Sequence, residues 1–130
     1  MPLVSFAVYE HILVGTDGSK TAAIAVERAV DLAQAFHSSL TVFSVGSPKR
    51  AGAAVEAAAK KYANSGVTIR TETVEGDPPT AIVDRAEKGD IDLLVLGNKG
   101  MTGATRFFLG SVPNKVSHHA PVALLIVRTT

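Results

Sequence analysis

The sequence contains no cysteine and no tryptophan, and only two tyrosines and five phenylalanines among its 130 residues. The lack of cysteine excludes a disulfide scaffold, a thiolate zinc site and a cysteine nucleophile. It is also compatible with the cytoplasm, which is the expected compartment. The lack of tryptophan, with neither tyrosine placed to cover a flavin ring, argues against a flavodoxin-like redox role.

The sequence also lacks an excess of charge of either sign, and it has no long apolar run. Thirteen basic and twelve acidic residues give a net charge of +1, and the basic residues are scattered, so neither a nucleic acid nor a membrane partner is expected. No apolar run reaches the roughly 18 residues of a membrane-spanning helix. Residues 1–8 lack the basic start and cleavage site of a signal peptide and are expected to be an N-terminal extension. Residues 9–130 are expected to form one domain, since 46% of the chain is hydrophobic.

What the sequence does contain is a regular alternation of apolar and amphipathic segments. The expected strands are residues 11–16, 40–45, 67–74, 92–97 and 121–127. The expected helices are residues 20–37, 48–65, 78–88 and 111–119, with Ser47 and Asp77 as N-caps of the second and third. This alternation predicts an α/β domain with a single open five-stranded parallel sheet, doubly wound, with helices on both faces. Right-handed crossovers favour the strand order 3-2-1-4-5.

Two connections flank the point where this strand order reverses, which is where ligands bind to open parallel sheets. The first is "TDGSK", residues 16–20. The second, "GNKGMTGATRFFLGS", residues 97–111, contains four glycines and is much longer than the two to six residues usual between a strand and a helix. A long connection inside a small domain usually serves a function, so we expect it to bind a ligand.

The residue types of this long connection suit a phosphate group. Gly110 and Ser111 open a helix, where free backbone N–H groups and the helix dipole favour an anion. Lys99 and Arg106 could neutralise its charge. The glycine spacing, G-x-x-G followed by nine residues and G-S, is neither the P-loop pattern nor the dinucleotide-binding pattern.

That spacing resembles the ATP-binding signature of the universal stress protein family. "HILVGTDGS" resembles the opening strand and acidic turn of the family, and "LGSVPNKVSHHAPVALLIVR" its closing helix and strand, so that the resemblance covers about residues 9–128. The resemblance implies a fold of the adenine nucleotide alpha-hydrolase-like type and binding of ATP, with or without Mg²⁺. Cyclic AMP is the alternative ligand, because some family members bind it.

The resemblance also implies which residues form the nucleotide site. The acid after the first strand lies at the nucleotide, the backbone at the end of the second strand contacts the adenine, and the glycines surround the phosphates and ribose. The predicted site comprises Gly15, Thr16, Asp17, Val45, Gly97, Asn98, Lys99, Gly100, Arg106, Gly110, Ser111 and Val112. The connection after Val45 is shorter than is common in the family, so part of the cover over the nucleotide is expected to be missing.

Several of these residues have plainer interpretations. Asp17 in "TDGSK" could serve only as a turn residue, and both roles can hold together. Lys99 could simply be solvated. His118 and His119 invite a metal site, but neighbours on a helix diverge and no third ligand has a helical spacing, so we interpret them as cations near a helix end and predict no metal site. Phe107 and Phe108 could stack on a base, although an apolar plug is the favoured interpretation.

The resemblance implies that the protein binds a nucleotide in a stress response, and we expect no enzymatic activity beyond slow hydrolysis. Asp17 has no partner arranged for catalysis. A phospho-receiver domain is a weaker alternative, because only one acid follows the first strand and Thr129 and Thr130, rather than a lysine, follow the last. A homodimer is expected through the last strand, Val122 to Val127, since an apolar edge strand would aggregate unless paired, and the resemblance implies such pairing.

Overall fold

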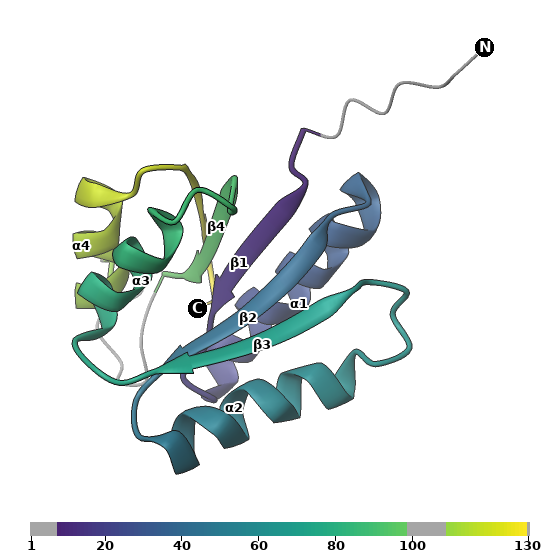
Figure 1. Cartoon of the computed structure of the whole chain (residues 1–130), viewed down its shortest axis with the longest axis horizontal. Helices are drawn as coiled ribbons and strands as arrows, with labels where there is room; N and C mark the ends of the chain where they lie inside the picture. Colours follow the sequence, from purple (N-terminus) through teal and green to yellow (C-terminus); the bar gives the residue numbers. More distant parts are fainter. Residues whose placement is uncertain (1–7, 99–108, 130) are drawn as a thin grey trace.

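The computed structural model of the chain describes residues 8–98 and 109–129, in which strands and helices alternate (Figure 1). In chain order the elements are β1 (His11–Gly15), α1 (Lys20–Phe36), β2 (Ser39–Val45), α2 (Pro48–Lys61), β3 (Ile69–Val74), α3 (Pro78–Ala86), β4 (Leu93–Gly97), α4 (Ser111–His119) and β5 (Ala123–Val127). All neighbouring strands are parallel, in the order β3-β2-β1-β4-β5. The predicted fold class and strand order are confirmed.

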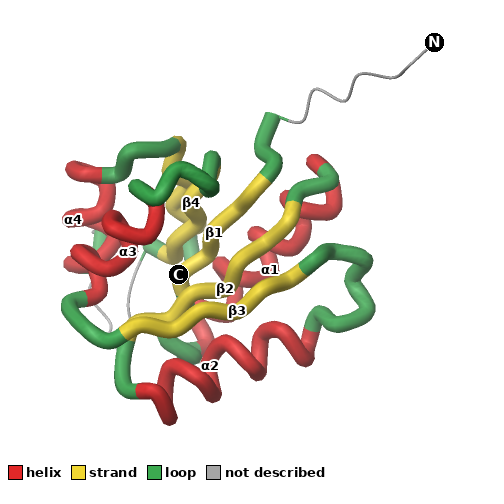
Figure 2. Tube along the Cα trace, in the orientation of Figure 1, coloured by secondary structure: helices red, strands yellow, loops and turns green. Residues whose placement is uncertain are grey.

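The sheet lies between two layers of helices (Figure 2). Helices α1 and α2 contact one face of the sheet, and α3, packed against α4, contacts the other. Successive side chains of a strand point to opposite faces. Ile12 and Val14 therefore join the core cluster under α1 and α2, whereas Leu13 joins the cluster under α3 and α4, and all three are fully buried. This two-sided burial explains why the central strands are apolar throughout.

The helices begin where the sequence predicts. The hydroxyl of Ser19 accepts a hydrogen bond from the N–H of Ala22 and caps α1, and Ser47 precedes Pro48 at the start of α2. Helix α3 begins after Asp77, but the carboxylate of Asp77 accepts a bond from the hydroxyl of Thr80 (2.7 Å) and makes no cap bond to the backbone. The turns that precede α1, α2 and α3 directly follow β1, β2 and β3, so they lie at the carboxyl ends of these strands.

The predicted end of α2 is wrong. The helix ends at Lys61, and the next residues form turns up to Gly66, whose φ is +84°. The N–H of Ser65 donates to the carbonyl of Tyr62, and the hydroxyl of Ser65 accepts from the N–H of Val67. Serine forms such local bonds in competition with the helix, so the chain leaves the helix before the glycine that was expected to end it.

The edge strands are shorter at their starts than predicted. β3 begins at Ile69 instead of Val67, because the N–H of Val67 is taken by the Ser65 hydroxyl. β5 begins at Ala123, two residues after Pro121, which has no N–H to donate to a sheet. β5 alternates between more and less exposed residues, whereas in β3 only Ile69 and Glu72 are partly buried and the other four residues are exposed. None of the helices within residues 8–98 and 109–129 is long and apolar enough to span a membrane.

Candidate functional site

A pocket of about 160 Å³ lies at the carboxyl ends of β1 and β4, where the strand order reverses. Five segments of the chain meet there: the β1–α1 turn, the end of β2, the start of α3, the end of β4 and the start of α4. Its lining residues are Gly15, Thr16, Asp17, Ala22, Phe43, Val45, Pro78, Ile82, Leu96, Gly97, Val112 and Pro113. Six of the predicted site residues are therefore brought together, namely Gly15, Thr16, Asp17, Val45, Gly97 and Val112.

The β1–α1 turn presents its polar groups in a fixed arrangement. The hydroxyl of Thr16 accepts a hydrogen bond from the N–H of Gly18 (3.1 Å), and one carboxylate oxygen of Asp17 accepts from the N–H of Ser19 (2.9 Å). Gly18 has a φ of +83°, which favours glycine. Asp17 thus has the turn role that the plainer interpretation gave it. Its side chain also remains exposed at the pocket, so a role toward a ligand stays compatible with that geometry.

The floor of the pocket is apolar and closely packed. Phe43, Ile82 and Leu96 are all at most 5% exposed. A Cβ at Gly15 would lie 2.8 Å from Leu96 Cδ2, which is closer than carbon atoms approach without displacement. The glycine therefore allows β1 to pass directly beside Leu96. This part of the pocket offers a ring system apolar contact and backbone groups, with few side-chain partners.

The start of α4 supplies hydrogen-bond donors at the other end of the pocket. The N–H of Gly110 donates to the carbonyl of Asn98 (2.8 Å), and Pro113 has no N–H. The N–H groups of Ser111 and Val112 have no hydrogen-bond partner among the described residues. Two unpaired donors at a helix N-terminus are suited to an anionic group.

Asn98 is one of the predicted residues that do not line the pocket. It is 7% exposed, and its side-chain oxygen accepts hydrogen bonds from the N–H and the hydroxyl of Thr129 (2.8 and 2.9 Å). Its bonds thus join β4 to the residues after β5. Gly110 and Ser111 stand beside the pocket through α4 but are absent from its lining. Lys99, Gly100 and Arg106, as well as Phe107 and Phe108, lie outside the described residues.

Sequence reasoning missed half of the lining residues, among them Phe43, Pro78, Ile82 and Leu96. Phe43 lies two positions before Val45 and so on the same face of β2, and Leu96 directly precedes Gly97. The signal was thus present in the alternation of the strands. Pro78 and Ile82 could have been found from the expected start of the third helix, which must also lie at the carboxyl edge.

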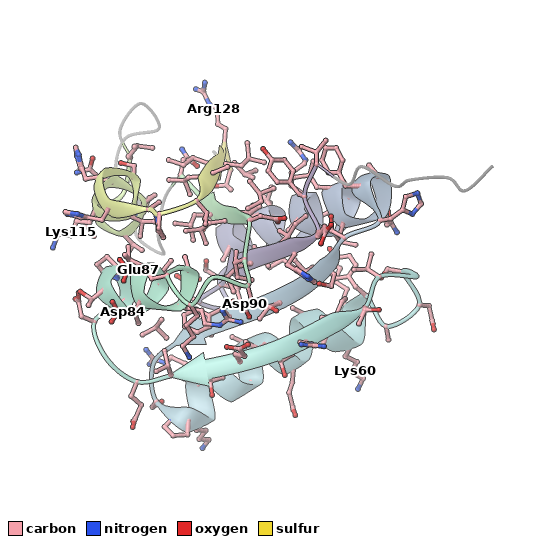
Figure 3. The ribbon with its side chains drawn as sticks, turned by 45° about the horizontal axis from the view of Figure 1, so that its top comes forward. Lys60, Asp84, Glu87, Asp90, Lys115 and Arg128 are labelled. Atoms are coloured by element: carbon pink, nitrogen blue, oxygen red, sulfur yellow. The ribbon has the colours of Figure 1, made fainter. Side chains whose placement is uncertain are left out.

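Charge near the pocket is sparse. Among the described lining residues Asp17 is the only charged one. Lys115, the lysine of α4, instead lines a hollow together with Asp84 of α3 and Glu87, which directly follows α3 (Figure 3). No group of three or more His, Cys, Asp or Glu side chains in residues 8–98 and 109–129 is placed to hold a metal ion. The described part of the pocket therefore offers one carboxylate and no cation.

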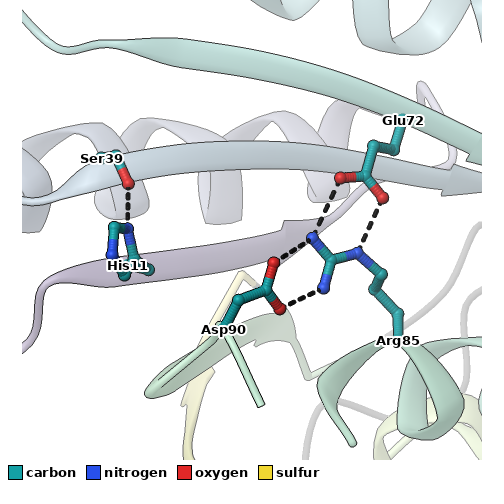
Figure 4. A network of polar contacts seen from close by, with 5 residues as sticks. All are labelled: His11, Ser39, Glu72, Arg85 and Asp90. Atoms are coloured by element: carbon teal, nitrogen blue, oxygen red, sulfur yellow. Dashed lines mark hydrogen bonds and ion pairs between the residues drawn. The ribbon is translucent and has the colours of Figure 1, made fainter. Parts of the chain in front are cut away.

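Arg85 lies behind the pocket on α3, the helix that supplies Pro78 and Ile82. It is 7% exposed and donates hydrogen bonds to both oxygens of Glu72 on β3 and both of Asp90 (Figure 4). These hydrogen bonds lower the pKa values of the Glu72 and Asp90 carboxyl groups and raise the pKa of Arg85. The network attaches the pocket wall formed by α3 to the edge of the sheet.

A larger groove of about 790 Å³ lies at the opposite, amino-terminal edge of the sheet. Residues such as His11, His37 and Ser65 line it. The hydroxyl of Ser39 is 2.6 Å from Nδ1 of His11 there (Figure 4). This groove lies at neither the switch point of the sheet nor a helix N-terminus. The smaller pocket at the carboxyl ends of β1 and β4 is therefore the stronger candidate for the ligand site.

A doubly wound α/β domain with a pocket at its switch point is typical of proteins that bind small ligands. Comparison with known proteins shows the family within this class. A profile of the universal stress protein family matches residues 8–65 and 47–128. The chain therefore belongs to the universal stress protein family.

Relatives of known name support this membership. The universal stress protein MJ0531 of Methanocaldococcus jannaschii is 33% identical over 141 positions, covering 93% of this chain and 83% of the relative. The universal stress protein Rv1636 of Mycobacterium tuberculosis is 32% identical over 146 positions, covering 95% of this chain and 99% of the relative. Both alignments are longer than this chain, so the relatives have residues that it lacks.

Solved structures agree in fold over nearly the whole chain. A universal stress protein crystallised in complex with cAMP is 34% identical, with a TM-score of 0.80 and coverage of 94% of this chain and 98% of that one. The crystal structure of Rv1636 is 38% identical, with a TM-score of 0.67 and coverage of 97% and 100%.

The predicted short connection after Val45 is confirmed by the structure. Only Gly46 and Ser47 separate β2 from α2. The two ranges matched by the family profile overlap in residues 47–65, which begin at this connection. The connection that follows Val45, a lining residue of the pocket, is thus two residues long.

Proposed function

We propose that the chain binds an adenine nucleotide, ATP in the first place, in the pocket at the carboxyl ends of β1 and β4. The observation that carries this proposal is an apolar cavity beside two N–H groups of α4 that have no hydrogen-bond partner within the described part of the chain. The cavity volume of about 160 Å³ is below the roughly 300–1,000 Å³ of whole-ligand sites. It suits one ring system, with the rest of the nucleotide extending toward α4.

The assignment of roles follows from this orientation. The apolar floor at Phe43 and Ile82 takes the base, with the Val45 backbone at its edge. The N–H groups of Ser111 and Val112 and the hydroxyl of Ser111 bind phosphate oxygens. Lys99 and Arg106 are proposed to neutralise the remaining charge, and Gly97, Gly100 and Gly110 to give the phosphates room. Among the described lining residues, Asp17 has the only carboxylate available to a Mg²⁺ ion that accompanies the nucleotide. The phosphates and water would supply the remaining ligands of that ion.

Occupancy, with at most slow hydrolysis, is the proposed basis of action in a stress response. Hydrolysis requires a base that positions the attacking water. In the described pocket Asp17 is the only group of that kind, and one of its oxygens is engaged by Ser19. We further propose that the protein acts in the cytoplasm as a homodimer joined through residues 122–127.

Cyclic AMP is the second candidate ligand. One specific observation favours it: the 34% identical relative was crystallised in complex with cAMP. The same apolar cavity would serve its base, and a single cyclic phosphate would reach α4 in place of a triphosphate.

Competition titration tests the proposal. Purified protein is titrated calorimetrically with ATP, ADP, AMP, cyclic AMP and GTP, with and without Mg²⁺. We expect ATP to bind more tightly than AMP, because more phosphate oxygens reach the α4 donors, and GTP to bind weakly. Absence of binding of every adenine nucleotide at millimolar concentration would reject the proposal. Sustained turnover of labelled ATP above about one per second, typical of enzymes, would reject the claim of mere occupancy.

A further inference from the structure

Asn98, the first residue after β4, joins three parts of the fold. Its backbone N–H donates to the carbonyl of Val127 at the end of β5 (2.9 Å), and its backbone carbonyl accepts from the N–H of Gly110 (2.8 Å). Its side-chain oxygen accepts from the N–H and the hydroxyl of Thr129 (2.8 and 2.9 Å). The ends of β4 and β5 and the start of α4 therefore meet at one residue.

The orientation of the Asn98 side chain is fixed by its partner. A backbone N–H can only donate, so the atom that faces the N–H of Thr129 must be the amide oxygen. Asn98 and Val127 are 7% and 4% exposed, so these bonds are shielded from water and their loss would leave donors unsatisfied. Asparagine supplies this acceptor while remaining neutral. An aspartate at this position would place a negative charge beside the expected phosphate.

The bond to Gly110 determines which donors α4 offers. Gly110 is the N-cap of α4, and its N–H donates to Asn98, so the next two N–H groups, of Ser111 and Val112, are the ones without a partner among the described residues. Their position relative to the pocket depends on where Asn98 holds Gly110. Asn98 itself does not line the pocket, so it can act on a ligand only through α4.

We propose that Asn98, held by Thr129, is a positioning residue that places the N-terminus of α4 for binding of the nucleotide phosphates. This inference rests on the proposed function, and replaces the direct contact that the sequence pattern predicts for Asn98. It assigns the phosphate-dependent part of the affinity, and not the base-dependent part, to a residue behind the site.

The test compares ATP with adenosine, which has the base and ribose but no phosphate. Dissociation constants for both are measured by calorimetry on wild type, Asn98→Ala and Thr129→Val. The ratio of the adenosine constant to the ATP constant isolates the contribution of the phosphates. Misplacing one charge-assisted hydrogen bond should lower this ratio about tenfold in Asn98→Ala, with adenosine affinity within twofold of wild type. Thr129→Val removes one donor of the two and should lower the ratio about threefold.

Ser38→Ala is the matched control. Ser38 is 6% exposed, and its hydroxyl donates to the carbonyl of Tyr9 at the opposite edge of the sheet. Its loss should lower the free energy of unfolding while leaving the ratio unchanged, which separates positioning from general destabilisation. Should Asn98→Ala fail to fold, Thr129→Val decides on its own.

Two outcomes would overturn the inference, and they are distinguishable. If wild type prefers ATP to adenosine and both variants keep that ratio within twofold, Asn98 has no positioning role and the proposed function stands. If wild type shows no preference for ATP over adenosine, the phosphate site is absent, and the proposed function fails together with the inference.

Discussion

Arg85 on α3 and Glu72 on β3 form an ion pair in which Nε and one terminal nitrogen of the guanidinium lie 2.7 and 3.0 Å from the two carboxylate oxygens (Figure 4). The arginine side chain is 8% exposed and the glutamate side chain 37%, so a buried cation meets an anion at the surface. Because α3 also carries Pro78 and Ile82 of the pocket wall, this pair connects the stability of the sheet edge to the shape of the candidate site.

Replacing Arg85 with alanine should destabilise the fold. The variant loses the buried stem of the arginine and both ion pairs, although Glu72 and Asp90 remain solvated, so we expect a loss of about 2 kcal/mol in the free energy of unfolding. Urea denaturation measures it. Arg70→Ala is the control: it removes an exposed arginine from β3, the strand that carries Glu72, and should change the free energy of unfolding by less than about 0.5 kcal/mol. Equal effects of the two substitutions would contradict a special role for Arg85.

Acid should remove the contribution of this network. Hydrogen bonds from Arg85 lower the pKa of Glu72 below its usual 4.5 and that of Asp90 below its usual 3.8. The contribution is therefore complete above those usual values and is lost as the pH falls through the lowered native values. The difference in unfolding free energy between wild type and Arg85→Met should be constant from pH 7 to about 5 and shrink toward pH 2.5. A difference that stays constant over the whole range would show that the packing of Arg85, and not its charge, stabilises the protein.

The strand order and the start of each helix could be predicted from patterns in the sequence itself, whereas the six predicted residues that line the pocket were implied by the resemblance to the family. Ser19 and Ser47 mark helix starts by their hydroxyl groups, and Gly15 and Gly97 end apolar runs. The burial of Arg85 could not be predicted, since nothing in the pattern of apolar residues of α3 shows that Glu72 and Asp90 form ion pairs with its guanidinium. The pairing of Asn98 with Thr129 could not be predicted either, because only the pairing of β4 with β5 brings these two residues together, so the sequence pattern places Asn98 at the ligand instead.

Gly15→Ala should narrow the pocket. A methyl group at this position would lie 2.8 Å from Leu96 Cδ2 and force that buried side chain to move. We expect a loss of about 1–2 kcal/mol in unfolding free energy and weaker ATP binding. Gly52→Ala is the matched control: its new methyl has no atom within 4 Å inside α2, so stability should rise by about 0.5–1 kcal/mol with unchanged binding. Unchanged stability and affinity in Gly15→Ala would refute the close contact.

Ser111→Ala should weaken ATP binding about fivefold, because it removes one hydroxyl donor and keeps the backbone N–H. Ser117→Ala serves as the comparison on the same helix. Its hydroxyl donates to the carbonyl of Asn114 (2.6 Å), away from the N-terminus of α4, so affinity should stay within twofold of wild type. The two variants are compared by calorimetry, and equal losses of affinity would mean that the Ser111 hydroxyl does not contact the nucleotide.

Leu125→Lys should convert a β5-mediated dimer into monomers. Leu125 is 36% exposed on the edge strand, and a lysine there would place charge in the proposed interface. Val74→Lys changes a similarly exposed residue, 40%, on the opposite edge strand β3 and should leave the dimer intact. Sedimentation velocity at micromolar concentration distinguishes the two. A wild-type monomer, or dissociation by Val74→Lys alone, would rule out pairing through β5.

The chain passes from β2 into α2 through Gly46 and Ser47 alone. Because so few atoms of this connection stand beside Val45, a ligand entering from that side displaces little of the protein and leaves with equal ease. We therefore expect rapid exchange, with association and dissociation both fast. If the proposed nucleotide site is correct, the protein would follow the momentary concentration of its nucleotide, whereas a deeply enclosed site would retain the molecule that it bound first.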